Sequence, residues 1–251
     1  MANRFFWYEL MTTDVDAAKR FYGDVVGWQM HGFPGAEDYT VIHAGERGIG
    51  GIMAMPDAMG AGMAPLWMGY VHVADADAAT AAIASGGGEV HRPASDIPNV
   101  GRFSVVADDQ GAVFNLLRPD GPDQPAMAQD AVGGVGWHEL YTGDIDKALA
   151  FYGAQFGWTA SQRMEMGEMG AYQLFSVDGA DNGGIMKNPM PGAPNMWVFY
   201  FTVPALDRAV AAITAGGGSI MMGPMEVPGG SWIAMATDPQ GAIFAVTARA
   251  R

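Results

Sequence analysis

Two glutamates, Glu9 and Glu139, hold the same place in two similar stretches of the chain. The stretch WYELMTTDVDAAKRFYGDVVGW begins at Trp7 and returns in the second half of the chain, from Trp137, as WHELYTGDIDKALAFYGAQFGW. Burial among apolar side chains raises the pKa of a carboxyl group, which can then act as a general base or anchor a cationic ligand. The alternative is a structural glutamate paired with an arginine or with backbone amides, and the sequence leaves both open.

Each glutamate lies in a segment with the pattern of a strand that leads into a helix. Residues 4–12 alternate between two faces, so Trp7, Glu9 and Met11 share one face. Asp14 is placed to cap the following helix, and Gly27 to end it in a left-handed conformation. Three short strands are expected next, near residues 28–33, 39–43 and 48–55, which completes one β-α-β-β-β module.

A second, shorter repeat divides each half of the chain again. The sequence Asp-Val-Asp-Ala-Ala at Asp14 returns as Asp-Ala-Asp-Ala-Ala at Asp75, and the segments at Ile145 and Leu206 have the same separation along the chain. Because both pairs of matching segments are separated by the same number of residues, the sequence indicates four β-α-β-β-β modules. The predicted domains are 1–118 and 135–251, joined by a linker over 119–134 that is rich in Pro, Asp and Gly. The predicted fold class is α+β.

Composition limits the partners that we expect. The 251 residues carry a net charge of −14, which disfavours nucleic acid and anionic membrane surfaces. The chain has no Cys, and therefore no disulfide framework, thiolate metal site or cysteine nucleophile. No apolar run is long enough to span a bilayer and the N-terminal residues do not form a signal peptide, so a cytoplasmic location is expected.

The modules together resemble a known family. Its marks here are a strand, an Asp-apolar-Asp helix start, the Phe-Tyr-Gly and Gly-Trp pairs, a Gly-Gly-Ile-Met strand at residues 50–53 and 183–186, and an Asp-Pro-Gln-Gly-Ala turn at residues 238–242. This pattern resembles the vicinal oxygen chelate superfamily of glyoxalase I, bleomycin-resistance proteins and extradiol dioxygenases, over essentially the whole chain. The resemblance implies that paired modules curl into two tandem cups.

The same resemblance implies where a divalent metal would be held. Catalytic members use His, Gln or Glu from the first and fourth strands of each module. The first-strand positions correspond here to Trp7, Met68, Trp137 and Val198. The fourth-strand positions of the second and fourth modules correspond to Asn115 and Ala245, and the other two fourth strands, residues 50–55 and 183–189, contain no His, Asp or Glu. We therefore expect no cofactor; the alternative is a divalent metal, whose usual ligand positions are not kept.

If Trp7 faces the cup, strand alternation sends a further set of side chains there. The expected ligand-binding residues are Trp7, Glu9, Met11, Met68, Tyr70, His72 and Asn115 in the first half, and Trp137, Glu139, Tyr141, Tyr200 and Thr202 in the second. Alternation places His138 on the opposite, core-facing side. Glu9 and His72 are the candidate catalytic residues, although a lone strand histidine is more often structural. Apolar walls with sparse polar groups are typical of small-molecule sites.

Three functions remain open at this stage. The first is a metal-free protein that binds a small hydrophobic or aromatic molecule in one or both cups, as a monomer or homodimer. The second is an enzyme of the same superfamily, a metal-dependent lyase, hydroxylase or dioxygenase with a non-standard site. The third is a structural or interaction module whose cups are filled by its own Trp and Met side chains. The sequence decides neither whether the protein is an enzyme nor which ligand it takes.

Overall fold

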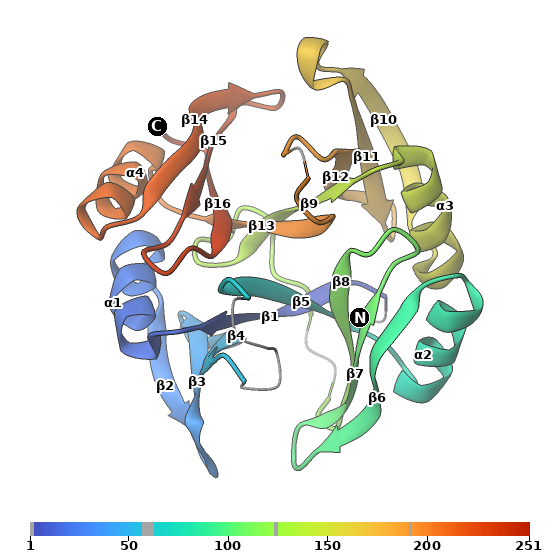
Figure 1. The fold of residues 1–251 in the computed structure, drawn as a ribbon. Helices are drawn as coiled ribbons and strands as arrows, with labels where there is room; N and C mark the ends of the chain where they lie inside the picture. The colour runs from blue at the N-terminus through green and yellow to red at the C-terminus, as the bar shows by residue number, and fades with distance from the viewer. Residues whose placement is uncertain (1–2, 57–62, 123–124, 191) are drawn as a thin grey trace. The chain divides into compact units, whose positions relative to one another are not determined.

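The computed structural model describes residues 3–56, 63–122, 125–190 and 192–251 and contains the expected β-α-β-β-β module four times (Figure 1). Module 1 consists of β1 (Phe5–Thr12), α1 (Val15–Val26), β2 (Gln29–Phe33), β3 (Ala36–Ala44) and β4 (Arg47–Ala54). Module 2 consists of β5 (Leu66–His72), α2 (Ala76–Ser85), β6 (Glu89–Ile97), β7 (Gly101–Ala107) and β8 (Val113–Pro119). Module 3 consists of β9 (Val135–Thr142), α3 (Ile145–Phe156), β10 (Thr159–Glu165), β11 (Ala171–Val177) and β12 (Ala180–Lys187), with a short 3-10 turn, η2 (Gly167–Met169). Module 4 consists of β13 (Met196–Thr202), α4 (Leu206–Ala215), β14 (Ser219–Val227), β15 (Ser231–Thr237) and β16 (Ile243–Ala248).

The strands form two eight-stranded sheets, one from each half of the chain. Their orders are β2-β3-β4-β1-β5-β8-β7-β6 and β10-β11-β12-β9-β13-β16-β15-β14. Within a module, the first and fourth strands pair in parallel and the remaining neighbours are antiparallel. The α+β fold class and the four modules predicted from the sequence are therefore confirmed.

The helix boundaries follow the capping signals in the sequence. The Asp14 carboxylate accepts a hydrogen bond from the Ala17 backbone N–H at 2.9 Å, as an N-cap residue does. Gly27 ends α1 with φ 85°, in the left-handed region. The first glycine of each triplet, Gly86 and Gly216, is the C-cap of α2 and α4.

One strand is longer than the sequence indicates. The sequence predicts a strand near residues 89–91, but β6 continues through Pro93 to Ile97. Its pairing with β7 shifts register on both sides of Arg92, and such irregularities accommodate a proline within a strand. The sequence also predicts a loop over residues 56–65, most of which lies outside the described residues.

Packing groups the chain into two compact units that each draw on both halves. Unit 1 comprises Met1–Phe6, Gly69–Ala126 and Trp137–Trp197, and unit 2 comprises Trp7–Met68, Met127–Gly136 and Val198–Arg251. Unit 2 contains α1 and α4, and unit 1 contains α2 and α3. The division into domains 1–118 and 135–251 stays a prediction, because this grouping follows packing and not chain order.

A buried tyrosine hydroxyl joins a helix to a strand-connecting turn in unit 2. Tyr22 of α1 donates a hydrogen bond to Asp238 Oδ2 at 3.1 Å and accepts one from Trp67 Nε1 at 2.9 Å. Asp238 Oδ1 also accepts from two backbone N–H groups of its own turn, those of Gln240 and Ala242. Burial raises the pKa of Tyr22 far above its usual value, so the phenol stays protonated and remains a donor.

Unit 1 repeats this arrangement with the corresponding residues. Tyr152 of α3 donates to Asp108 Oδ2 at 3.0 Å and accepts from Trp197 Nε1 at 3.0 Å. We call these two arrangements the core relays. In each, a helix from one half of the chain is joined to the strand-connecting turn of the other half, which fixes how the modules pair.

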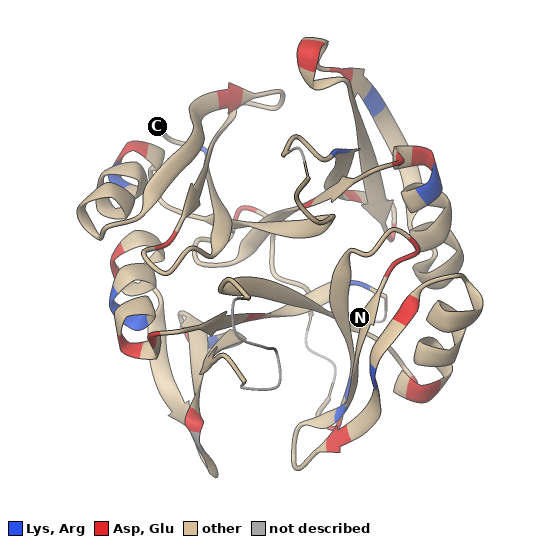
Figure 2. Cartoon of the chain, in the orientation of Figure 1, with Lys and Arg blue, Asp and Glu red and all other residues tan. Residues whose placement is uncertain are grey.

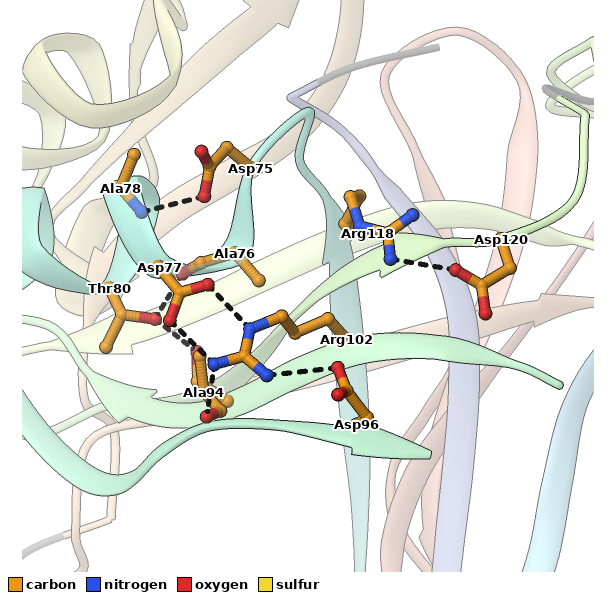
Figure 3. A network of polar contacts seen from close by, with 11 residues as sticks. Asp75, Ala76, Asp77, Ala78, Thr80, Ala94, Asp96, Arg102, Arg118 and Asp120 are labelled. Carbon is orange, nitrogen blue, oxygen red and sulfur yellow. Dashed lines mark hydrogen bonds and ion pairs between the residues drawn. The ribbon is translucent and has the colours of Figure 1, made fainter. Parts of the chain in front are cut away.

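A polar network on the surface of unit 1 joins α2 to the sheet. Arg102 of β7 donates to both carboxylate oxygens of Asp77 in the first turn of α2, to Asp96 and to the Ala94 carbonyl oxygen (Figure 3). The hydrogen bonds from Arg102 lower the pKa of Asp77. Elsewhere acidic side chains are found on all four helices, with Lys or Arg interleaved on α1, α3 and α4 (Figure 2).

Removing the hydroxyl from either core relay should destabilise the fold. Tyr22→Phe leaves the buried Asp238 carboxylate and the Trp67 indole N–H without their shared partner, which typically costs about 1–3 kcal/mol. Tyr152→Phe should have the same effect in unit 1. Urea unfolding followed by circular dichroism measures both, and a loss below about 0.5 kcal/mol in either variant would contradict a stabilising role for that relay.

Candidate functional site

In unit 2, Glu9 belongs to a hydrogen-bonded cluster with two aromatic side chains. The Tyr39 hydroxyl of β3 donates to Glu9 Oε2 at 2.9 Å and accepts from the Trp7 indole Nε1 at 3.0 Å. Glu9 is only 8% exposed. Burial, followed by the neighbouring Glu9 charge, raises the pKa of Tyr39 well above its usual value, so Tyr39 remains a neutral donor to the carboxylate.

Unit 1 contains the same cluster built from the second copy of the sequence. Tyr172 of β11 donates to Glu139 Oε2 at 2.7 Å and accepts from Trp137 Nε1 at 2.9 Å. Tyr141 is also hydrogen-bonded to Glu139, and burial followed by the Glu139 charge raises the Tyr141 pKa far above its usual range. The first half has Met11 at the position of Tyr141, so the two clusters differ by one phenol.

These clusters depend on two glycines in the fourth strands. Gly51 of β4 is the register partner of Glu9, and Gly184 of β12 is the register partner of Glu139. A Cβ added at Gly51 would collide with the Tyr39 ring and hydroxyl, and one added at Gly184 would collide with Tyr172 in the same way. Each tyrosine therefore occupies the space that a side chain from the fourth strand would need.

The strand register also identifies the fourth-strand positions that the sequence could not align. In the first half, Tyr70 pairs with Asn115 as Glu9 pairs with Gly51. In the second half, Tyr200 pairs with Ala245 as Glu139 pairs with Gly184. The four fourth-strand positions are therefore Gly51, Asn115, Gly184 and Ala245. Together with Trp7, Met68, Trp137 and Val198 on the first strands, they supply a single amide oxygen as a possible donor. These residues do not fit a divalent metal.

The remaining described residues supply no replacement for that donor set. Across the described part of the chain, no group of three or more His, Asp or Glu side chains is placed to hold a metal ion. No step of any reaction is therefore assigned to a metal at this position.

The structure brings some of the predicted site residues together and leaves others apart. Trp7 joins Glu9, and Trp137 and Tyr141 join Glu139, as strand alternation predicts. In unit 1, Tyr70 lies opposite Asn115, whose buried Oδ1 has no hydrogen-bond partner. The other predicted residues are all buried, and their assignment to a ligand site stays a prediction: Met11, Met68, His72, Tyr200 and Thr202.

Two residues of the clusters, Tyr39 and Tyr172, are absent from the set predicted from the sequence. The predicted set rests on strand alternation along the first and fifth strands of each half, whereas Tyr39 and Tyr172 lie on the third. Tyr39 and Tyr172 have the same separation along the chain as Gly51 and Gly184. Extending the alignment outward from the Gly-Gly-Ile-Met strand would have paired the two tyrosines.

His138 lies in the core of unit 1, on the face opposite Glu139, as the alternation predicts. Its ring stacks on Phe5 with centroids 5.2 Å apart, and Nδ1 lies 2.9 Å from the Asn182 carbonyl oxygen. Burial lowers the pKa of His138 to about 4, so the ring is neutral at neutral pH. This neutral, buried ring has a structural role.

Comparison with known proteins agrees with this geometry. The family model described as "Glyoxalase/Bleomycin resistance protein/Dioxygenase superfamily" matches residues 4–116 and again residues 134–246. The chain belongs to this superfamily. It is 37% identical to "Putative glyoxylase CFP32" of Mycobacterium tuberculosis over 243 residues, which cover 96% of this chain and 92% of that protein.

Further relatives place this superfamily member among proteins of similar length. "Anthracycline biosynthesis protein DauV" of Streptomyces sp. (strain C5) is 30% identical over 255 residues, covering 96% of this chain and 91% of that protein. Among solved structures, the Mn(II)-bound glyoxalase from Novosphingobium aromaticivorans aligns with a TM-score of 0.68 at 15% identity, over 100% of this chain and 83% of that one. This structural likeness shows a shared fold. Within the described residues, no helix is long and apolar enough to cross a membrane.

Gly51→Ala should disrupt the cluster in unit 2. The new methyl group collides with Tyr39, and overpacking of this kind typically costs about 1–3 kcal/mol. Gly23→Ala in α1 is the matched control: its nearest neighbour is 3.8 Å away, so it should be neutral or stabilising. Combining Gly51→Ala with Tyr39→Ala should cost less than the sum of the single changes in urea unfolding. Additive costs would contradict a direct collision.

His138 should make the fold sensitive to acid. Because its pKa is lower in the folded protein than the usual 6.5, the unfolded chain binds more protons between pH 6.5 and about 4. The free energy of unfolding should therefore fall as the pH decreases through this window, by up to about 3 kcal/mol. The wild type and His138→Gln, compared by urea unfolding at pH 7.5 and 4.5, isolate this contribution. Equal pH dependence in the two proteins would contradict it.

Proposed function

We propose that this protein binds a small planar aromatic or hydrophobic molecule at its Trp–Tyr–Glu clusters, without a metal ion at the superfamily's metal position. The observation that carries this proposal is that, in both halves, a tyrosine takes the space of a metal-binding side chain from the fourth strand. Glycines at 51 and 184 admit a tyrosine hydroxyl where a ligand side chain of the fourth strand would lie. Retention of the same Trp–Tyr–Glu arrangement in both copies supports a role in ligand binding.

Each residue of the cluster has a distinct role in this proposal. The indole of Trp7 or Trp137 stacks on the planar ligand, because aromatic faces favour offset or edge contacts. Glu9 or Glu139 accepts a hydrogen bond from the ligand's hydroxyl or ammonium group, since a carboxylate has about four acceptor sites. Tyr39 or Tyr172 holds the carboxylate and the indole in place. The second phenol, Tyr141, makes the Glu139 site more polar than the Glu9 site.

The relatives and the charge are compatible with this class of ligand. One relative is named for anthracycline biosynthesis and another as a glyoxylase, so proteins of this length in the superfamily occur in more than one chemical context. The net charge of −14 supports a neutral or cationic small molecule as partner, in preference to nucleic acid or an anionic membrane.

The proposal is tested with two aromatic probes, 2-naphthol and 2-naphthylmethylammonium, in a thermal-shift and calorimetric titration. Both should raise the Tm, and binding should be unchanged in EDTA because no metal takes part. Glu9→Gln with Glu139→Gln should weaken binding of the ammonium probe about tenfold, the worth of one charge-assisted hydrogen bond. Loss of binding in EDTA, or no binding of either probe, would overturn the proposal.

A control variant distinguishes the effect of the Glu9 cluster on probe binding from the effect of net charge. Glu46 is an exposed carboxylate in the turn between β3 and β4 of unit 2. Glu46→Gln removes the same charge as Glu9→Gln and should leave probe affinity unchanged. Equal weakening by Glu46→Gln and Glu9→Gln would assign the effect to net charge and not to the cluster.

A further inference from the structure

A pair of histidines lies on β2 and β3, on the same face of the sheet as Glu9. Strand register establishes this, because Glu9 pairs with Gly51, Gly51 with Val41 and Val41 with His31. Partners across a sheet point to the same face. His43 is two residues from Val41 along β3 and so lies on that face as well.

The two imidazole rings are in contact. Their centroids are 5.2 Å apart and the ring planes are inclined by 62°. Zn²⁺ bound to imidazole nitrogen has bond lengths of about 2.0–2.1 Å, so two rings on one tetrahedral ion have centroids about 5 Å apart. The observed separation of the ring centroids matches that distance.

A second observation concerns His43 itself. Its Nδ1 is buried and has no hydrogen-bond partner. A buried polar nitrogen without a partner is unfavourable, and coordination would satisfy it. His31 is exposed and provides access from solvent. Gln29 lies directly opposite His43 on β2, on the same face, and could add a side-chain oxygen.

We propose that His31 and His43 form a two-histidine site for a borderline divalent transition-metal ion such as Zn²⁺, with the remaining positions open to water or to Gln29. Imidazole ligands favour such ions over Mg²⁺ and Ca²⁺, which prefer oxygen. This site is separate from the superfamily's first- and fourth-strand positions. It does not derive from the duplication, because the second half has Ser161 and Ser176 at the corresponding places.

The site is close to the Trp–Tyr–Glu cluster of unit 2. Gly48 is the strand partner of His43, and a Cβ at Gly48 would lie 3.6 Å from the Trp7 ring. His43 is therefore one strand away from Gly48, which lies against the Trp7 ring. The zinc site goes beyond the proposed aromatic binding and does not depend on it.

The test is calorimetric titration of the chelator-treated, full-length protein with Zn²⁺. The wild type should bind one Zn²⁺ at this site, and zinc should raise its Tm. His31→Gln with His43→Gln should weaken this binding at least about tenfold, since loss of even an outer-shell partner costs 10–100-fold. Mg²⁺ and Ca²⁺ should not compete.

Two controls distinguish the possible results. His91 is a single exposed histidine on β6 of unit 1, and His91→Gln should bind Zn²⁺ like the wild type. Equal zinc binding by the wild type and the double histidine variant, or equal weakening by His91→Gln, would overturn the site. The double histidine variant should still bind the naphthyl probes, so failure of the zinc site and failure of the proposed aromatic binding are separate results.

Discussion

The arrangement of the chain depends on two buried tyrosine hydroxyls that each join an indole N–H to a carboxylate. Tyr22 and Tyr152 each contribute one donor and one acceptor, and each connects a helix to a turn from the other half of the chain. A buried carboxylate is unfavourable unless its hydrogen bonds are satisfied. One oxygen of Asp238 and of Asp108 accepts from its own turn, and the other is satisfied by the tyrosine of the helix that packs against that turn. The relays therefore favour one pairing of four similar modules over the alternatives.

The same hydrogen-bonded arrangement, in which a tyrosine hydroxyl joins an indole N–H to a carboxylate, recurs at the candidate site in a more exposed setting. In the core relays it is fully enclosed and holds modules together. In the Trp7 and Trp137 clusters it includes the first-strand positions that the resemblance to the superfamily implies for a metal, and the indoles remain partly exposed. A neutral phenol beside a carboxylate leaves a negative, hydrogen-bond-accepting site next to an aromatic face. In the proposed function, this site binds hydrogen-bond donors and planar groups.

The sequence predicted the fold well because its signals were local and repeated. Asp14 and Gly27 mark one helix, and two constant offsets, one between halves and one within each half, indicate four modules. Alternation also placed Trp7 with Glu9 and put His138 on the core side. It could not show that Tyr39 reaches Glu9, because that contact depends on the register of β3 against β4 and on a missing side chain at Gly51. The His31 and His43 pair was missed for the same reason: their spacing matches no ligand motif, and only cross-strand register brings the rings together.

The grouping of modules into units has a consequence for the history of the chain. Each unit takes modules from both halves, so a single half with the same packing would leave its helices and turns without their partners. An ancestral gene that encoded one half would have required two copies of its product to complete either unit. Gene duplication and fusion would then have made that association permanent and fixed its stoichiometry. Once the copies were joined, each could change independently, as the differences between Met11 and Tyr141 and between Asn115 and Ala245 illustrate.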